Sequence, residues 1–338
     1  MTVAFLESPH QILIQDVPLP EPQAGDVRVR LTQTGICGSD VHLFLGHRLL
    51  ANRTSIGHEG LGYIDKIGPG VVGRSLGERV VIEPNIPCRR CRFCQAGKGN
   101  ICINKRVVGQ TEPGCFAQYV VLPAEFCPPV PDSISDTDAV TIEPTAVALH
   151  ALLASSAKPG DSIAVIGLGA IGLLLTHVAL AFGYRVFVTE LNPGKVRLAE
   201  SLGATALCPT GTPDEQVSHL ADRWLAEEVY AVFECAGTAA TASLATAAAP
   251  RGSEVVLVGL AEKPAQFTPL KIAREGITIV PSIIYDHPVD FKRTLRLIES
   301  GIIRPGFIVS RHMPLHDLQV ALELASEGNE SKIVITIP

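Results

Sequence analysis

The chain has 338 residues, which is long for a single hydrophobic core, so we expect two domains. Apolar residues make up 46% and charged residues 18%, a composition that supports buried sheets and excludes a disordered chain. Because the net charge of -6 comes without a basic block and no apolar run could cross a bilayer, we expect a cytoplasmic protein that binds neither nucleic acid nor membrane.

Residues 1–142 are expected to form a β domain. Short runs of β-branched residues, separated by Gly and Pro, occur at 26–33, 61–68, 78–84 and 117–123. Runs of this kind are typical of strands in a barrel-like sheet.

Four cysteines stand close together inside this β domain, at residues 88–102. Cys88, Cys91, Cys94 and Cys102 have the spacing C-x2-C-x2-C-x7-C. In a chain of this size a tight cysteine cluster favours metal over disulfides, and four thiolates suit tetrahedral zinc. An iron–sulfur cluster is the alternative, but the bacterial ferredoxin run has a shorter last gap followed by proline. We predict a closed structural zinc site with no position left for a substrate.

A second set of metal-binding side chains is scattered over three motifs. GICGSDVH (35–42) holds Cys37, IGHEG (56–60) holds His58 and Glu59, and IEPTAVALH (142–150) holds Glu143. A catalytic zinc takes three protein ligands and keeps one exchangeable position. Each residue also has an ordinary alternative, such as a core thiol, a turn histidine or a solvated acid, so spacing alone leaves the shared site open.

Residues 143–278 are expected to form a dinucleotide-binding domain. Ala-rich helical stretches alternate with apolar runs such as SIAVIG and YRVFVTE, which indicates a parallel sheet with βαβ connections. The first run continues into a glycine-rich turn and a helix. There the first glycine permits a tight turn, the second lets a pyrophosphate approach, and the third lets helix pack on strand. The predicted cofactor-binding residues are Gly167, Gly169, Ala170, Ile171 and Gly172.

Glu190 ends the second apolar run, where dinucleotide-binding proteins place an acidic residue. A carboxylate there accepts hydrogen bonds from both ribose hydroxyls and repels a 2′-phosphate, so we predict NAD rather than NADP. Residues 279–338 carry a helical segment at 290–301 and a short strand pair that ends in KIVITIP.

Taken together, the motifs resemble the zinc-dependent medium-chain alcohol dehydrogenases, most closely their polyol (sorbitol-type) branch. The resemblance rests on GICGSDVH, GHE, the four-cysteine lobe, IEPTAVALHA, VIGLGAIG, ECAG, VLVGL and KIVI. It implies an α/β plus β architecture, with a Rossmann-type doubly wound parallel sheet inserted into a GroES-like β-barrel catalytic domain. The insert is then 143–278, the catalytic domain is 1–142 together with a C-terminal return at 279–338, and the active site lies between them.

The resemblance also implies roles for the scattered residues. Cys37 and His58 match the first two ligands of a catalytic zinc ion. Glu59 and Glu143 match acids that bind this zinc directly or through its water. The implied cofactors are NAD and two zinc ions per chain, one catalytic and one structural.

Further matches concern proton transfer and the cofactor. Ser39 and His42 match a relay that carries the alcohol proton through the nicotinamide ribose to solvent. Lys195 matches a basic residue near the adenosine ribose, and Val258 lies in the cofactor-binding VLVGL motif.

The implied reaction is oxidation of a secondary alcohol in a polyol, sugar alcohol, cyclitol or vicinal diol to the ketone, in a homotetramer or homodimer. Two alternatives stay open, namely a threonine or 2,3-butanediol dehydrogenase, and a non-catalytic nucleotide-binding or redox-sensing protein. Two segments on the substrate side depart from the branch. Ile284 stands before Tyr285 where many sorbitol-type enzymes have arginine, and residues 43–57 lack the usual proline.

Overall fold

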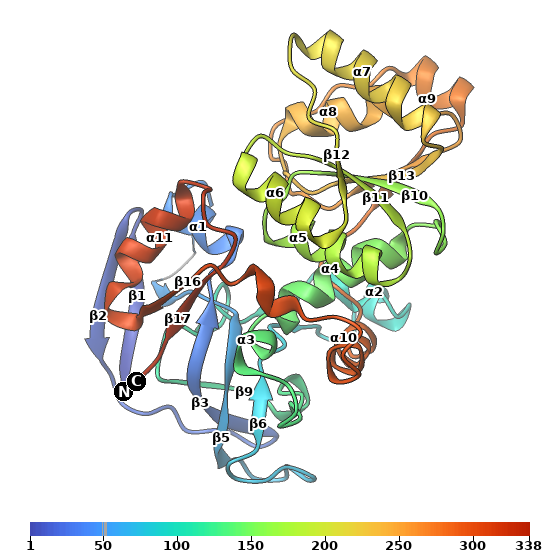
Figure 1. Ribbon diagram of the computed structural model, residues 1–338. Helices are drawn as coiled ribbons and strands as arrows, with labels where there is room; N and C mark the ends of the chain where they lie inside the picture. Colours follow the sequence, from blue (N-terminus) through green and yellow to red (C-terminus); the bar gives the residue numbers. More distant parts are fainter. Residues whose placement is uncertain (49, 51–52) are drawn as a thin grey trace. The chain divides into compact units, whose positions relative to one another are not determined.

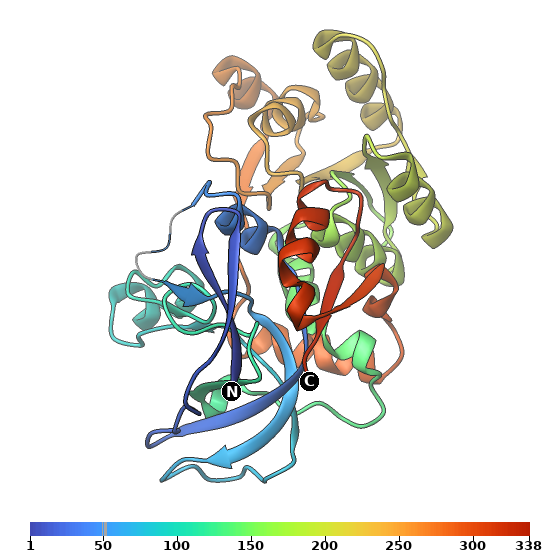
Figure 2. The ribbon, with the colours of Figure 1, turned by 90° about the vertical axis from the view of Figure 1, so that its left-hand side faces the viewer.

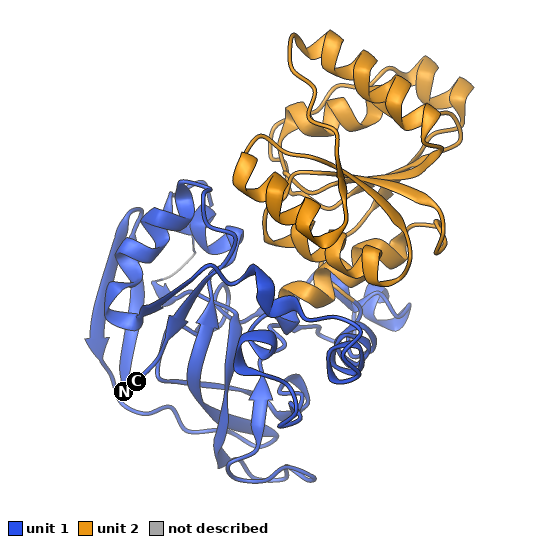
Figure 3. Ribbon diagram, in the orientation of Figure 1, with its two compact units in different colours: residues 1–143, 286–338 blue, residues 144–285 orange. Residues whose placement is uncertain are grey.

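A computed structural model describes residues 1–48, 50 and 53–338, and the chain divides into two compact units (Figures 1 and 3). Unit 1 consists of Met1–Glu143 and Asp286–Pro338, and unit 2 of Pro144–Tyr285. The expected limits of the inserted domain were 143 and 278, whereas unit 2 continues to Tyr285 because a further strand, β15 (Thr278–Pro281), belongs to its sheet. Within the divergent segment 43–57, Leu49, Ala51 and Asn52 lie outside the described residues.

The strands of unit 1 form a six-stranded sheet, a three-stranded sheet and a small pair. The bounds are β1 (Thr2–Ser8), β2 (Gln11–Asp16), β3 (Asp26–Gly35), β4 (Thr54–Ser55), β5 (Glu59–Ile67), β6 (Arg79–Val81), β7 (Asn85–Ile86), β8 (Arg106–Val107), β9 (Tyr119–Pro123), β16 (Arg311–Pro314) and β17 (Ile333–Thr336). The six-stranded sheet has the order β16-β17-β3-β5-β6, with β9 also paired to β3. The C-terminal strand β17 is therefore a direct neighbour of β3, and both chain ends belong to unit 1 (Figures 1 and 2).

Helices are short in unit 1. They are α1 (Gly38–Phe44), α2 (Arg92–Gln95), α3 (Asp136–Ala139), α10 (Val289–Glu299) and α11 (Leu318–Ser326), with 3-10 turns η1 (Gly99–Ile101), η2 (Ala124–Phe126), η3 (Pro305–Ile308) and η4 (Leu315–Asp317). Alternate residues of β3, Val27, Val29 and Leu31, are fully buried in a core that also contains Phe44 of α1 and Leu322 of α11. This period of two is what an amphipathic strand requires.

Unit 2 is a doubly wound parallel sheet. Its other strands are β10 (Ser162–Ile166), β11 (Arg185–Thr189), β12 (Thr205–Ala206), β13 (Val229–Glu234) and β14 (Glu254–Leu257), and its helices are α4 (Ile142–Ala154), which starts at the unit boundary, α5 (Ala170–Ala181), α6 (Pro193–Leu202), α7 (Pro213–Ala226), α8 (Ala239–Ala248) and α9 (Pro269–Glu275). The strand order β12-β11-β10-β13-β14-β15, all parallel, is that of dinucleotide-binding folds. Helices α5 and α6 cover one face and α7 and α8 the other (Figure 1).

Every residue of β10 is buried, as expected for a central strand covered on both faces. In the described part of the chain, no helix combines the length and the apolar character needed to span a membrane.

Candidate metal sites and cofactor-binding loop

The four cysteines of the lobe converge as their spacing predicts. The ligand atoms of Cys88, Cys91, Cys94 and Cys102 all lie within 4.8 Å of one another. The Sγ atom of Cys91 is 3.5 Å from that of Cys94 and 3.9 Å from that of Cys102. Zn–S bonds of ~2.3 Å in a tetrahedron put the sulfurs about 3.8 Å apart, so the group fits a zinc ion with four sulfur ligands.

Short turns hold these sulfurs. Cys91 caps helix α2, Cys94 lies within it, and Cys102 follows η1. Hydrogen bonds from the backbone, first that of Cys94, lower the pKa of Cys91 to about 6, whereas burial and the neighbouring thiols raise the pKa of Cys94 to about 12. Adjacent thiolates repel one another, and a divalent cation would remove that repulsion.

The scattered set of candidates also meets in unit 1. The ligand atoms of Cys37, His58 and Glu59 lie within 4.8 Å of one another. Cys37 caps α1 and His58 stands just before β5, so the turn after β3 and the start of β5 together form the group. A thiol, an imidazole and a carboxylate are a donor set suited to zinc.

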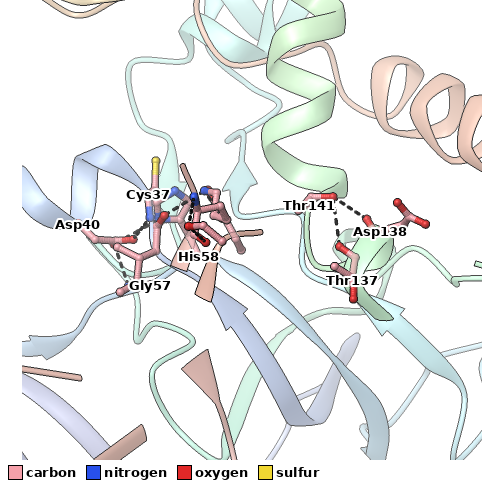
Figure 4. Close-up of polar contacts among 11 residues, drawn as sticks. Cys37, Asp40, Gly57, His58, Thr137, Asp138 and Thr141 are labelled. Atoms are coloured by element: carbon pink, nitrogen blue, oxygen red, sulfur yellow. Dashed lines mark hydrogen bonds and ion pairs between the residues drawn. The ribbon is translucent and has the colours of Figure 1, made fainter. Parts of the chain in front are cut away.

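Asp40, which is 1% exposed, joins the two halves of this group (Figure 4). Its Oδ2 accepts from the Cys37 N–H at 2.9 Å and its Oδ1 from the Gly57 N–H at 3.0 Å. The same Oδ1 lies 3.5 Å from Nδ1 of His58. That separation makes an ion pair with a protonated His58 ring, and Nδ1 forms no hydrogen bond with the described residues.

The charge environment of His58 is strongly negative. Although burial lowers it, the pKa of His58 is raised well above its ordinary value by Asp40 and Cys37. The pocket thus already favours a positive charge at this position. Binding of a zinc ion would displace the proton from His58 and put a larger positive charge in its place.

Glu59 has a buried partner that the sequence motifs did not indicate. Nζ of Lys332 lies 2.7 Å from both carboxylate oxygens of Glu59 and donates to the Ile36 carbonyl at 2.9 Å. The two side chains are 2% and 0% exposed. Burial opposes the shift, but Glu59 and Cys37 raise the pKa of Lys332. Glu59 is therefore paired with a buried ammonium group beside the candidate metal ligands.

Gly35 makes room for that carboxylate. A Cβ atom at Gly35 would lie 2.1 Å from Oε2 of Glu59, so the Glu59 side chain would have to move away from its present position. By contrast, a Cβ atom at Gly38, three residues further on, would meet nothing within 4 Å.

Glu143 lies in the first turn of α4 and is buried, but it does not belong to the three-residue group within 4.8 Å. Burial raises its pKa to about 7, and the nearby charges of His58 and Lys332 lower it against that effect. Glu143 is thus electrostatically coupled to the group. A threonine network anchors the helix start next to it, because Thr141 donates to the Asp138 carbonyl at 2.9 Å (Figure 4).

Ser39 and His42, the predicted relay residues, both lie on α1. They are three residues apart, so their side chains share one face of the helix. Ser39 is half-buried and His42 is exposed. Solvent exposure therefore increases from Ser39 to His42, as expected for two residues that pass a proton to solvent.

The glycine-rich turn after β10 has the space that a pyrophosphate requires. Gly167 has a φ of +88°, and a Cβ atom there would lie 2.7 Å from Ala236; one at Gly172 would lie 1.9 Å from the Gly167 carbonyl oxygen. A Cβ atom at Gly169, the N-cap of α5, would meet nothing within 4 Å, and no side chain caps the helix. Ala170 and Ile171 begin α5, so their N–H groups can donate to phosphate at a positive helix end.

Glu190 is fixed beside this turn by backbone donors. Its Oε2 accepts from the Leu168 N–H at 2.7 Å, and its Oε1 accepts from Leu191 at 2.7 Å and Asn192 at 2.9 Å. A carboxylate offers about four acceptor positions and three are in use, so about one remains for a ribose hydroxyl. The half-buried Lys195 lies in the first turn of α6, which Asn192 caps.

Val258 directly follows β14, and its N–H donates to the Glu234 carbonyl at 2.9 Å. Gly167, Glu190 and Val258 thus all follow parallel strands of one sheet. They lie at its carboxyl edge, where dinucleotides bind in this fold. In the divergent stretch after β15, Ile284 has a φ of +58°, a left-handed conformation that costs a β-branched residue about 1–2 kcal/mol.

Sequence reasoning did not identify Asp40 and Lys332. Asp40 follows Cys37 by three residues, which is the spacing of a helix capping box, and this signal could have found it. Lys332 carries no such local signal.

Comparison with known proteins gives two family matches. The domain described as "Alcohol dehydrogenase GroES-like domain" matches residues 23–132, and that described as "Zinc-binding dehydrogenase" matches residues 170–300.

Individual relatives match along the whole chain. A probable D-xylulose reductase A of Neosartorya fischeri is 32% identical over 98% of this chain and 95% of its own, and a sorbitol dehydrogenase of Bacillus subtilis is 31% identical over 100% and 97%. The crystal structure of an alcohol dehydrogenase from E. coli CFT073, complexed with NADH, has a TM-score of 0.91 at 27% identity and covers 99% of each chain.

Proposed function

Because the chain belongs to the zinc-dependent medium-chain alcohol dehydrogenase family, we propose that it oxidises a secondary alcohol of a polyol or vicinal diol to the ketone, with NAD as the hydride acceptor. The observation that carries this proposal is the group of Cys37, His58 and Glu59 in unit 1. Its ligand atoms come from two separate segments, and Asp40 accepts a hydrogen bond from the backbone of each.

In this proposal Cys37 and His58 hold the catalytic metal, with Glu59 or Glu143 as the third ligand. When bound, zinc supplies a Lewis acid that favours loss of the alcohol proton, and NAD accepts the hydride. Asp40 places a negative charge beside the His58 ring, and Lys332 forms a buried ion pair with Glu59. Ser39 and His42 accept the proton from the substrate side and pass it toward solvent.

A separate structural zinc ion would occupy the lobe of Cys88, Cys91, Cys94 and Cys102. Four protein sulfurs complete a tetrahedral coordination shell, so this ion could not bind a substrate. Its role would be to hold the loop between β7 and β8.

The proposed cofactor preference depends on Glu190. Its carboxylate is held beside the glycine-rich turn by three backbone N–H groups, at 2.7–2.9 Å. A negative charge there disfavours a 2′-phosphate and favours free ribose hydroxyls. Lys195 and Val258 would contribute to the same pocket.

The substrate class rests on the relatives. Proteins described as sorbitol dehydrogenase and D-xylulose reductase align with nearly the whole chain at about the same identity. The compounds in these two names, sorbitol and D-xylulose, have a secondary hydroxyl flanked by other hydroxyls or the corresponding ketone. We therefore propose a sugar alcohol or related polyol, ahead of threonine and 2,3-butanediol.

A substrate panel with metal counting tests the proposal. NADH formation is followed with sorbitol, xylitol, cyclitols, 2,3-butanediol and threonine, before and after chelation, and zinc is measured on the same samples. We expect two zinc ions per chain and loss of activity on chelation. Full activity in protein shown to have lost its metal would refute the proposal.

Single cysteine variants sharpen that test. Cys37→Ser should abolish turnover and remove one zinc ion, while NADH still binds. Cys208→Ser is the matched control, because Cys208 is exposed and far in sequence from the candidate ligands. Equal zinc content in both variants would show that Cys37 is not a ligand.

We further propose that the chain forms a homodimer or homotetramer through the β15 edge of unit 2. β15 is the last strand of the sheet and Ile279 on it is 37% exposed. The preceding helix α9 has no buried residue, and Leu270 on it is 64% exposed. Sedimentation of the wild type and of Ile279→Lys tests this. A monomeric wild type, or an unchanged assembly in the variant, would exclude this edge.

A further inference from the structure

His42 has a close histidine neighbour that the proposed relay does not include. Its Nδ1 atom lies 3.2 Å from Nδ1 of His47, with the ring centroids 5.5 Å apart and the planes at 49°. This distance is within the range of an N–H···N hydrogen bond, provided that one ring carries its proton on Nδ1 and the other does not. Both side chains are exposed.

The end of helix α1 brings the two histidines together. The His47 N–H donates to the His42 carbonyl at 3.0 Å, and the Gly46 N–H donates to the Leu43 carbonyl at 3.1 Å. This pair of bonds is a Schellman motif, in which the residue after the glycine lies against the last turn of the helix. The Arg48 N–H also donates to the His42 carbonyl, at 3.3 Å.

Gly46 is required for this turn. Its φ is +74°, and a Cβ atom there would lie 2.8 Å from Pro9. The backbone therefore places His47 against the last turn of α1, within reach of the His42 side chain.

We propose that His47 extends the proton relay, receiving the proton from His42 and releasing it to solvent. The inference rests on the proposed dehydrogenase function, in which His42 receives the alcohol proton. It assigns to His47 a role as a relay residue, one step further from the reacting atoms.

The proton count balances over the two rings. A proton that arrives on Nε2 of His42 makes that ring a cation, and its Nδ1 proton moves to Nδ1 of His47. His47 then carries protons on both nitrogens and releases the one on Nε2 to a base in solvent. Exchange with water restores the starting tautomers, because both rings are exposed. In the reduction direction the same steps run backwards.

Three variants of the metal-loaded enzyme test the relay at low buffer concentration. His47→Ala removes the ring, and His47→Gln keeps a hydrogen-bonding side chain that cannot carry the proton. Since His42 remains, we expect both to lower kcat for alcohol oxidation by about ten-fold, less than the ~10²-fold or more of a full general base. KM should stay the same, and added imidazole should restore kcat.

His10→Gln is the matched control. His10 is exposed and packs against Phe44 of the same helix, with ring centroids 5.3 Å apart. It should keep the wild-type rate with and without imidazole. A wild-type rate in His47→Gln, or a loss in His47→Ala that imidazole does not restore, would overturn the proposal, because His47 would then only position His42.

A second measurement does not depend on activity. Titration of the histidine rings by 15N NMR should show His42 changing its tautomer and its titration curve in His47→Gln but not in His10→Gln. If the wild type oxidises no alcohol of the panel, the proposed function fails, and this measurement still decides on the pair. Identical His42 titration in all three proteins would overturn the inference.

Discussion

In zinc-free protein, replacing Lys332 by Met should leave the carboxylate of Glu59 buried without the ammonium group that contacts it. Lys332 contacts both oxygens of Glu59 at 2.7 Å, and the two side chains are 2% and 0% exposed. At an effective dielectric constant of 20, this attraction amounts to roughly 6 kcal/mol before the cost of desolvation. Loss of one partner from such a buried pair costs about 3–5 kcal/mol net.

The loss should appear as a lower Tm. For a domain of this size, about 3–5 kcal/mol corresponds to a drop of roughly 6–20 °C. Lys66→Met is the matched control, because Lys66 contacts Glu21 at 2.5 Å with side chains 48% and 60% exposed. An exposed pair contributes at most about 1 kcal/mol, so the control should shift the Tm by only a few degrees.

Thermal unfolding by circular dichroism, with zinc content measured on the same samples, checks this expectation. Adding Glu59→Gln to Lys332→Met should recover part of the lost stability, because the uncompensated charge disappears. The reasoning would be refuted if Lys332→Met unfolded at the same temperature as Lys66→Met. It would also be refuted if the double variant were less stable than Lys332→Met alone.

Three further changes test other parts of the structure. Gly35→Ala should displace Glu59, lower the free energy of unfolding by about 1–3 kcal/mol and lower the zinc content. The control Gly38→Ala should change neither quantity. Equal unfolding curves and equal zinc content in the two variants would contradict this expectation. Glu190→Gln should relax the preference for NAD, measured as the ratio of kcat/KM for NAD and NADP, and an unchanged ratio would show that the carboxylate does not contact the ribose. Burial raises the pKa of Glu83 above 4.5, so the folded state binds the carboxyl proton more tightly than the unfolded state does. The stability that this proton contributes is complete below pH 4.5. It is lost as the pH rises through the folded-state pKa of Glu83. Glu83→Gln should therefore lose less stability than the wild type between pH 4.5 and neutrality, as measured by urea unfolding; parallel pH profiles would rule this out.

The sequence correctly predicted those features of the structure that depend on residues close together in the chain. The fold class, the parallel sheet and the strand–turn–helix at Gly167–Gly172 follow from periodicity and glycine spacing. The cysteine lobe follows from spacing too, because its ligands lie within one loop and short turns bring them together. In such segments the chain has few ways to arrange its side chains.

The environment of Glu59 could not be predicted in this way. Lys332 reaches Glu59 only because β17 pairs with β3 in one register, with Val334 opposite Gly35. A slip of one residue would turn Lys332 to the other face of the sheet. No local motif predicts the register of β17 or the burial of the Lys332 charge. Nor does a local motif predict the electrostatic interaction between Glu143 and His58.

The separation of Glu59 and Lys332 along the chain also bears on the order in which the two candidate metal sites form during synthesis. The two residues are 273 positions apart, which at ~5–20 residues per second separates their synthesis by roughly 14–55 s. The cysteine lobe is translated as one short piece and can take up its metal while the ribosome is still at work. The candidate site around Glu59 is complete only once the C-terminal strand has emerged, so we expect the lobe to become able to bind zinc before that site does.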